Sequence, residues 1–174
     1  MSGSEFRRVP FTYTWIEQNK ILAGSIPQRP EDLNVLQSLG IQTIISLTRR
    51  DIRTYPGMDL LQDFNYGHYP IPDGGLASDE LMLNAVTYLD QSLHSELRVP
   101  VFVHCRGGIG RTGTILLAYY VLRRGLSLTQ AREIVKVRRN YEGNASAIDQ
   151  GSPQREWIDS LAVLYLSIIE RMKA

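Results

Sequence analysis

The feature that most constrains this chain is a glycine-rich stretch, VHCRGGIGRTGT, at Val103–Thr114. The short apolar segment 100–103 has the composition of a buried strand, and the apolar run that starts at Ile109 predicts a helix. Glycine permits the unusual backbone angles of a tight turn between two such elements. The turn also carries Cys105, the only cysteine of the 174 residues. One thiol is therefore fixed at the junction of a strand and a helix.

Predicted strands and helices alternate along the rest of the chain. Strands are predicted at residues 12–18, 21–23, 41–47, 67–71 and 100–103, with the first two forming a hairpin. Helices are predicted at residues 30–40, 78–96, 109–124 and 127–140, and from Ser152-Pro153 to the end. This order predicts an α/β fold in which a central, mostly parallel twisted sheet carries helices on both faces. Ligand sites of such folds lie at the carboxyl edge of the sheet, where the glycine turn is expected.

Composition narrows the class of protein. At 174 residues the chain is expected to form a single domain, with residues 1–6 (MSGSEF) read as a tail left by cloning. A net charge of +1 gives no general attraction for nucleic acid, and the apolar run at 115–122 is too short to span a membrane.

Targeting and cysteine usage add further expectations. No signal peptide is apparent, and a single cysteine excludes an internal disulfide, so a cytoplasmic location is expected. A monomer is the expected state. Three scattered histidines and one cysteine have no metal-ligand spacing, so neither a metal nor another cofactor is predicted.

The glycine turn has the properties of an anion-binding loop. Backbone N–H groups at the start of a helix point toward a bound anion, and the helix dipole adds positive potential. The expected phosphate-binding residues are those of the loop itself: Arg106, Gly107, Gly108, Ile109, Gly110 and Arg111. Arg111 adds a planar guanidinium that can hold two phosphoryl oxygens at once. The lysine of nucleotide-binding P-loops is missing, so a nucleotide is not the expected ligand.

Cys105 makes this binding loop a candidate catalytic site. N–H donors and an arginine stabilise a thiolate, and a thiolate that faces a phosphoryl group is a nucleophile. Thr112 follows Arg111 and is predicted to donate its hydroxyl to the sulfur, which would ease the later departure of the thiolate. A lone cysteine after a strand is more often a small buried apolar residue. The combination of cysteine, five residues, arginine and threonine in one turn favours the catalytic interpretation.

The segment HCRGGIGRT resembles the signature of the cysteine-dependent protein tyrosine phosphatases, in which His-Cys is followed by five residues, Arg and Ser or Thr. The short chain is similar to the small dual-specificity members, including atypical and archaeal ones, from about Thr12 to the last helix. The resemblance implies hydrolysis of phosphotyrosine, and of phosphoserine and phosphothreonine, through a cysteinyl-phosphate intermediate. The implied partners are a phosphorylated protein or peptide as substrate and phosphate- or sulfate-like anions in the loop. For His104 a structural role is expected.

Hydrolysis also needs an acid and an oriented water. The family uses an aspartate on an upstream loop, and Asp73 in PIPDGG follows a predicted strand 32 residues before Cys105. The alternative is that Asp73 only stabilises a Pro-Asp-Gly turn. Asp63 and Asp79 lack the strand–turn setting and are weaker candidates. Gln154 resembles the position that orients water in related enzymes, and a solvated first-turn glutamine is the alternative.

The sequence is also compatible with other substrates and other functions. Arg49, Arg50 and Arg53 follow a predicted strand and favour acidic or multiply phosphorylated substrates, unless the loop is merely solvated and balanced by Asp51. The alternatives to a phosphoprotein phosphatase are an enzyme for phosphoinositides or other non-protein phosphomonoesters, a non-catalytic phosphate-binding regulator, and a sulfurtransferase.

Overall fold

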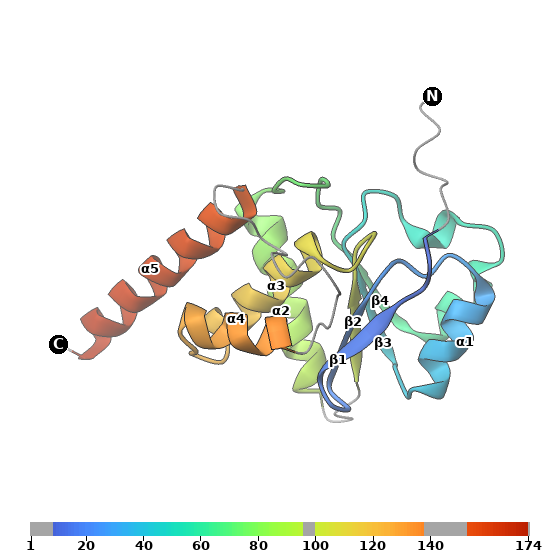
Figure 1. Cartoon of the computed structure of the whole chain (residues 1–174), viewed down its shortest axis with the longest axis horizontal. Coiled ribbons are helices and arrows are strands. Elements are labelled where there is room, and N and C mark those ends of the chain that lie inside the picture. The colour runs from blue at the N-terminus through green and yellow to red at the C-terminus, as the bar shows by residue number, and fades with distance from the viewer. Residues whose placement is uncertain (1–8, 96–99, 138–152, 174) are drawn as a thin grey trace.

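The computed structural model describes residues 9–95, 100–137 and 153–173, and its centre is a five-stranded sheet in the order β1-β2-β5-β3-β4 (Figure 1). The strands are β1 (Tyr13–Glu17), β2 (Ile21–Gly24), β3 (Thr43–Ser46), β4 (Asn65–His68) and β5 (Val101–His104). β1 and β2 form the predicted antiparallel hairpin, and β2, β5, β3 and β4 each run parallel to the next. The predicted mostly parallel sheet is confirmed.

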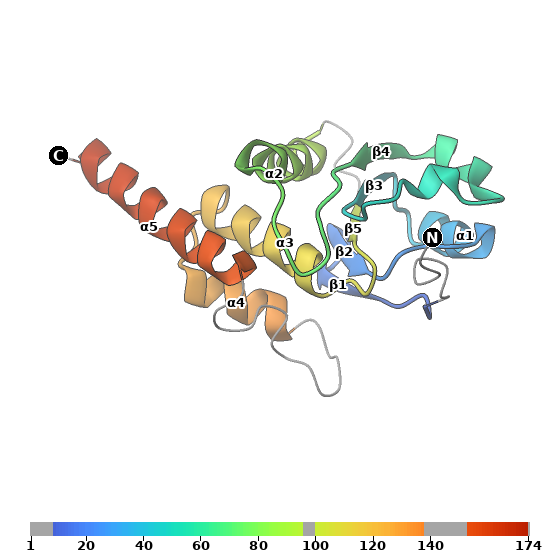
Figure 2. The same cartoon turned by 90° about the horizontal axis from the view of Figure 1, so that it is seen from above.

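Helices cover both faces of the sheet. They are α1 (Pro30–Ser38), α2 (Asp79–Leu93), α3 (Gly110–Leu122), α4 (Leu128–Val137) and α5 (Pro153–Lys173). Short 3-10 helices, Ile52–Thr54 and Met58–Asp63, follow β3, and the first lies within residues 48–57, which were expected to form a loop. Figure 2 shows α1 on one side of the sheet and α2 and α3 on the other, with α5 extending away from the body. The predicted end of the fourth helix at 138–140 and the 1–6 tail lie outside the described residues.

The side chains of the central strand β5 divide the interior into two clusters. Val101 and Val103 belong to the cluster formed with α2 and α3, whereas Phe102 packs with Leu22 and Ile44 in the cluster on the α1 side. This two-residue alternation is that of a strand buried on both faces. Burial on both faces fixes the register of β5, and with it the position of Cys105, which follows the strand.

Capping residues set helix starts as predicted. Ser78 Oγ accepts a hydrogen bond from the N–H of Leu81 at 3.3 Å, at the start of α2. At the start of α4, the N–H of Ser127 donates to Gln130 Oε1 at 2.9 Å, and the N–H of Gln130 donates to Ser127 Oγ at 3.2 Å. These reciprocal bonds form the expected capping box.

The position of β4 differs from its prediction. The strand spans Asn65–His68, upstream of the expected 67–71, because Pro70 has no N–H to donate to the ladder. The chain still continues beside β3, since the N–H of Tyr69 donates to the carbonyl of Ser46 at 2.9 Å. The loop after β4 therefore leaves from the same edge of the sheet as the loop after β3.

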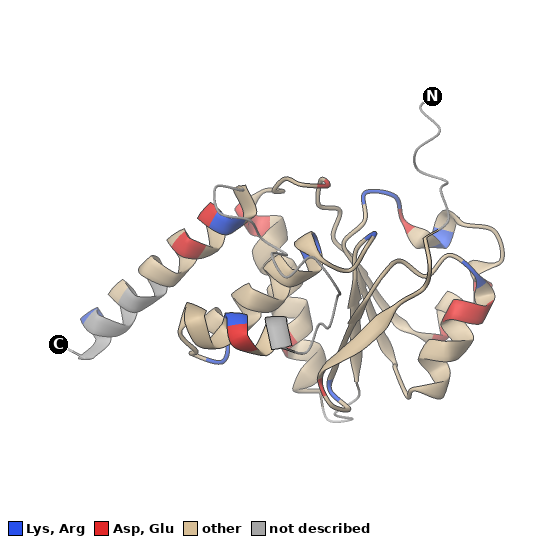
Figure 3. Ribbon diagram, in the orientation of Figure 1, with Lys and Arg blue, Asp and Glu red and all other residues tan. Residues whose placement is uncertain are grey.

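The carboxyl ends of β2, β5, β3 and β4 meet along one edge, because these four strands run in the same direction. Figure 3 shows basic residues at this edge, on the loop after β3 and on the turn between β5 and α3, and an acidic residue on the loop between β4 and α2. In the described part of the chain, no helix is long and apolar enough to cross a membrane.

Candidate active site

The turn between β5 and α3 is fixed by contacts with the segment that follows β2. The N–H of Ile26 donates to the carbonyl of Arg106 at 3.1 Å. Gly108 has a φ of +73°, and a Cβ at this position would lie 2.3 Å from the carbonyl oxygen of Gly24. Only glycine fits this left-handed and closely packed position. Gly108 therefore serves the packing of the turn against β2 as well as the shape of the loop.

The turn lines a pocket of about 480 Å³ at the start of α3. The lining residues are Val9, Asp73, Cys105, Arg106, Gly107, Ile109, Gly110 and Arg111. All the predicted phosphate-binding residues except Gly108 thus meet at one pocket. Cys105 is only 2% exposed, yet it contributes to the lining. The first turn of α3 adds positive potential, as expected for an anion site.

Arg111 is buried, and its guanidinium reaches the ends of β3 and β4. Nη1 donates to the carbonyl oxygens of Ile71 at 3.1 Å and Leu47 at 3.5 Å. Nη2 lies 3.0 Å from Oδ1 of Asp73. Nε has no hydrogen-bond partner among the described residues. The guanidinium is therefore held in place by carbonyl groups, and its Nε is a donor that these contacts leave unused.

Asp73 comes to the same pocket on the loop between β4 and α2. Its side chain is 72% exposed, even though it pairs with the buried Arg111. The next residue, Gly74, has a φ of +69° and nothing within 4 Å of a Cβ built on it. The upstream aspartate therefore lies at the same pocket as the cysteine turn, as expected. Its role as the acid stays a prediction.

The two weaker acid candidates have other contacts. Asp63 Oδ2 accepts a hydrogen bond from Gln37 Nε2 at 3.3 Å, next to the amino end of β4. Asp79 Oδ1 accepts one from the indole N–H of Trp157 at 2.9 Å, which links α2 to α5. Neither residue lines the pocket that contains Cys105.

Thr112 and Gln154 are placed differently from what was expected. The hydroxyl of Thr112 is buried and has no hydrogen-bond partner among the described residues, so the predicted bond to the sulfur of Cys105 is not formed in this arrangement. Gln154 is 5% exposed, and its Nε2 donates to the carbonyl of Gly75 at 3.1 Å. The solvated-glutamine alternative is therefore wrong. Gln154 connects the start of α5 to the loop that carries Asp73.

His104 is fully buried directly before Cys105. Its Nδ1 lies 3.2 Å from the carbonyl oxygen of Cys105, and its ring stacks on Phe102 with centroids 5.5 Å apart. Burial lowers the pKa of His104 to about 3, and the charge of Arg111 acts in the same direction. The imidazole is therefore neutral at physiological pH. Positive potential at the pocket of the thiol therefore comes from Arg111, Arg106 and the start of α3, and not from His104.

The partners of Arg111 were not predicted from the sequence. The carbonyl groups of Leu47 and Ile71 belong to the loops after β3 and β4. These oxygens are part of the backbone, so a residue of any type at either position would offer the same acceptor. No local sequence signal identifies them, because they become neighbours of Arg111 only through the strand order. Within the described ranges, no group of three or more His, Cys, Asp or Glu side chains could hold a metal ion.

Several known proteins are similar to this chain in sequence. Dual specificity protein phosphatase 1-A of Xenopus laevis is 33% identical over 108 residues, which are 62% of this chain and 27% of that protein. The amyloplastic phosphoglucan phosphatase DSP4 of Castanea sativa is 28% identical over 138 residues, which are 74% of this chain and 36% of that protein. The chain thus spans only about a quarter to a third of the length of these relatives.

Solved structures share the fold. The crystal structure of Tk-PTP aligns with a TM-score of 0.71 over 93% of this chain and 97% of that chain, at 23% identity. Residues 10–155 also match the family described as "Swiss Army Knife protein, DSP-PTPase phosphatase domain". This match includes the cysteine turn and the Asp73 loop. The chain belongs to this family of dual-specificity phosphatase domains, within the cysteine-dependent protein tyrosine phosphatases.

Proposed function

We propose that this chain is a phosphoric monoester hydrolase that removes phosphate from phosphotyrosine, and from phosphoserine and phosphothreonine, in proteins or peptides. The observation that carries the proposal is the meeting of Cys105, Arg111 and Asp73 at one pocket. A thiol, a phosphate-binding guanidinium and a carboxyl group are the three functions that two-step hydrolysis requires. The family to which the chain belongs supports the same activity.

The first step transfers the phosphoryl group to sulfur. The thiolate of Cys105 attacks phosphorus and forms the S–P bond, while the bond between phosphorus and the leaving oxygen breaks. Protonated Asp73 gives its proton to that oxygen, so an alcohol or phenol leaves. Loop N–H groups and Arg111 stabilise the charge on the equatorial oxygens, as preorganised donors do in phosphoryl transfer.

The second step returns the enzyme to its starting state. A water molecule attacks the cysteinyl phosphate, the carboxylate of Asp73 accepts a proton from it, and the S–P bond breaks. Inorganic phosphate and the Cys105 thiolate are the products. Gln154 supports this step, or the first, by its bond to the loop of Asp73.

One observation favours a second candidate substrate class. A small pocket beside the cysteine turn is lined by arginines, which suits compact polyanions better than a peptide backbone. Hydrolysis of a non-protein phosphomonoester is therefore the alternative. One of the proteins similar to this chain is named as a phosphoglucan phosphatase. A non-catalytic phosphate-binding regulator is less well supported, because Cys105, Arg111 and Asp73 are all at the pocket.

The test compares the wild type with Cys105→Ser. Initial rates are measured on p-nitrophenyl phosphate, matched phosphotyrosine and phosphothreonine peptides, and an inositol monophosphate. We expect wild-type turnover of the aryl phosphate and the peptides, and loss of turnover to background in Cys105→Ser. Acid-quenched wild-type enzyme should gain the mass of one phosphoryl group. Absence of wild-type turnover, or full turnover by Cys105→Ser, would refute the mechanism.

A further inference from the structure

A second, smaller pocket adjoins the pocket of Cys105. Its volume is about 100 Å³, and it lies against the loop after β3. The two pockets share Val9, Asp73, Arg106 and Arg111 in their linings. Pockets for whole small-molecule ligands have volumes of roughly 300–1,000 Å³, so the smaller pocket is sized for one substituent of a ligand.

The smaller pocket, called the arginine pocket below, is strongly basic. Arg49, Arg50, Arg106 and Arg111 line it, and Asp73 is the only acidic residue in its lining. The whole chain has a net charge of only +1, so this positive charge is concentrated locally rather than spread over the surface. Clefts lined by charge of one sign focus the electrostatic field and concentrate ions of the opposite sign. The chemistry of the pocket thus points to an anionic substituent.

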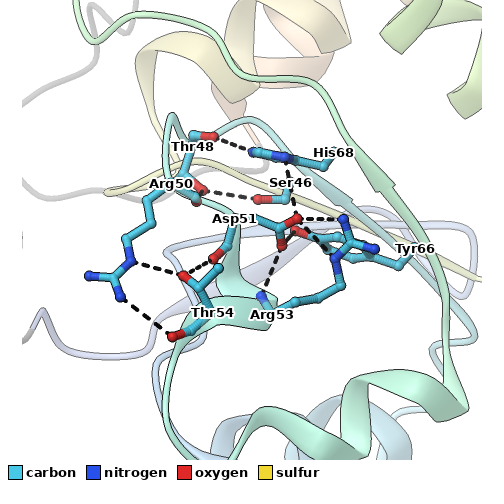
Figure 4. A network of polar contacts seen from close by, with 8 residues as sticks. All are labelled: Ser46, Thr48, Arg50, Asp51, Arg53, Thr54, Tyr66 and His68. Atoms are coloured by element: carbon cyan, nitrogen blue, oxygen red, sulfur yellow. Dashed lines mark hydrogen bonds and ion pairs between the residues drawn. The ribbon is translucent and has the colours of Figure 1, made fainter.

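Arg50 lines this pocket, and its guanidinium is held in position by the contacts drawn in Figure 4. Its Nε donates to Thr54 Oγ1 at 2.9 Å, and its Nη2 reaches the Thr54 carbonyl at 3.4 Å. The group also lies over the ring of Tyr55, with 4.9 Å between Cζ and the ring centroid. A guanidinium fixed in this way loses little conformational freedom when it binds an anion.

The alternative for the arginines of this loop was a solvated surface whose charge is balanced by Asp51. The contacts of Asp51 show that it does not pair with Arg49 or Arg50. Its carboxylate accepts hydrogen bonds from the backbone N–H and Nε of Arg53, both at 2.9 Å, and from the hydroxyl of Tyr66 at 3.0 Å. Figure 4 shows this carboxylate directed toward Arg53 and Tyr66, on the side away from the Arg50 guanidinium. Arg49 is exposed and has no hydrogen bond or ion pair within the described ranges. Its charge is available to a ligand.

We propose that the arginine pocket binds a second phosphate group of the substrate, carried on the atom next to the one that bears the scissile phosphate. Phosphate matches the planar donor fork of arginine. Because the two pockets share Arg106 and Arg111, the two anionic groups must be close neighbours. Phosphates on adjacent carbons of a polyol meet this requirement, whereas phosphates on separate residues of a peptide lie further apart. The inference rests on the proposed phosphomonoesterase activity and concerns which substrates that site prefers.

The test measures binding rather than turnover, so that it is independent of the proposed activity. Calorimetry with the Cys105→Ser protein gives the Kd of three probes: an inositol monophosphate, a bisphosphate with phosphates on adjacent ring carbons, and an isomer with phosphates on opposite carbons. We expect the adjacent isomer to bind at least about tenfold more tightly than both others, the gain of one charge-assisted hydrogen-bond pair. Equal binding of the two bisphosphates would overturn the proposal, because total charge alone would then explain affinity.

Two charge-matched variants locate the effect. Arg49→Gln should reduce the preference for the adjacent isomer to about threefold or less. Lys20→Gln removes the same charge at the β1–β2 hairpin, where the lysine is 62% exposed, and should leave the preference unchanged. Equal losses in both variants would contradict a local subsite. A doubly phosphorylated peptide serves as a fourth probe, and a preference for it without one for the adjacent polyol bisphosphate would also overturn the proposed subsite. Failure of the wild type to hydrolyse any phosphomonoester would reject the proposed function alone.

Discussion

The carboxylate of Asp73 lies 3.0 Å from the guanidinium of Arg111, which joins the candidate acid to the candidate phosphate clamp. The pair is asymmetric, because Arg111 is 5% exposed and Asp73 is 72% exposed. Ion pairs with an exposed partner contribute little stability and exchange readily. A phosphoryl dianion would compete with Asp73 for the same guanidinium. Substrate binding is therefore expected to release the carboxyl group, which then becomes available to the leaving oxygen.

The first prediction concerns Asp73→Asn. An amide cannot protonate the leaving oxygen, so kcat on a substrate with a poor leaving group should fall by about 10²- to 10⁴-fold. The loss should be much smaller on p-nitrophenyl phosphate, whose leaving group needs little protonation. The amide also competes less with an anion for Arg111, so inhibition by inorganic phosphate should become stronger. Steady-state kinetics on both substrates measure these effects.

Asp63→Asn is the matched control for this prediction. Asp63 carries the same functional group, but it contacts Gln37 near the amino end of β4. Its substitution should leave both rates within about twofold of the wild type. A normal kcat for Asp73→Asn on the poor leaving group would remove Asp73 from the mechanism.

The second prediction separates two roles for Gln154. Its bond to the Gly75 carbonyl indicates that it positions the Asp73 loop. Gln154→Met keeps the length of the side chain and removes the donor, so the loop loses its attachment to α5. We expect kcat/KM on a poor leaving group to fall about tenfold, because that parameter includes the protonation by Asp73. The same change at Gln37 on α1 is the control.

Pre-steady-state kinetics distinguish this role from the orientation of water. If Gln154 oriented the attacking water, Gln154→Met would slow only the second step. The phosphoenzyme would then accumulate, and p-nitrophenyl phosphate would give a burst of product close to one equivalent. An unchanged kcat/KM combined with such a burst would exclude the positioning role.

The fold and the central residues of the site were predictable because their signals are local. The composition of 100–103, the glycine turn and the apolar run behind it specify a strand, a turn and a helix around Cys105. Asp73 was chosen because the phosphatase resemblance implied an acid on an upstream loop, and the loop of Asp73 follows a predicted strand. The partners of Arg111 and the tight approach of Gly108 to Gly24 depend on β5 lying between β2 and β3. Strand order is not encoded in any single segment, so these contacts required the structure.

The third prediction concerns Gly108→Ala. The added Cβ would lie 2.3 Å from a backbone oxygen of Gly24, at a φ of +73°. Gly40→Ala is the control, because its φ is +76° but nothing lies within 4 Å of the new Cβ. The control should cost about 1 kcal/mol and lower Tm by roughly 2–4 °C. Gly108→Ala should lower Tm by clearly more and weaken the binding of inorganic phosphate. Equal Tm values for the two variants would show that the turn adapts to the methyl group.

The fourth prediction starts from the neutral state of His104. Its pKa in the folded protein is lowered to about 3 by burial, whereas an unfolded chain has a histidine pKa of about 6.5. Between these values the unfolded state binds a proton that the folded state does not. Stability from this group is therefore fully present above about pH 6.5 and is lost as the pH falls toward 3. Although burial acts to raise the pKa of Asp51, hydrogen bonds from Arg53 lower it to about 2, so the stability from this carboxylate is present above about pH 4 and is lost only as the pH falls from about 4 toward 2.

The free energy of unfolding should consequently fall by up to about 1.4 kcal/mol per pH unit between about pH 6 and 4.5, through His104 alone. Urea unfolding of the wild type and His104→Gln at several pH values in this window measures the effect. The variant should be less stable at pH 7, because it loses the stacking on Phe102, but its stability should depend less on pH. His94→Gln, at a histidine whose side chain is 67% exposed, controls for the removal of an ordinary imidazole. Identical pH slopes for the wild type and His104→Gln would mean that the buried imidazole takes up its proton without unfolding, and that the turn around Cys105 can accept a second positive charge.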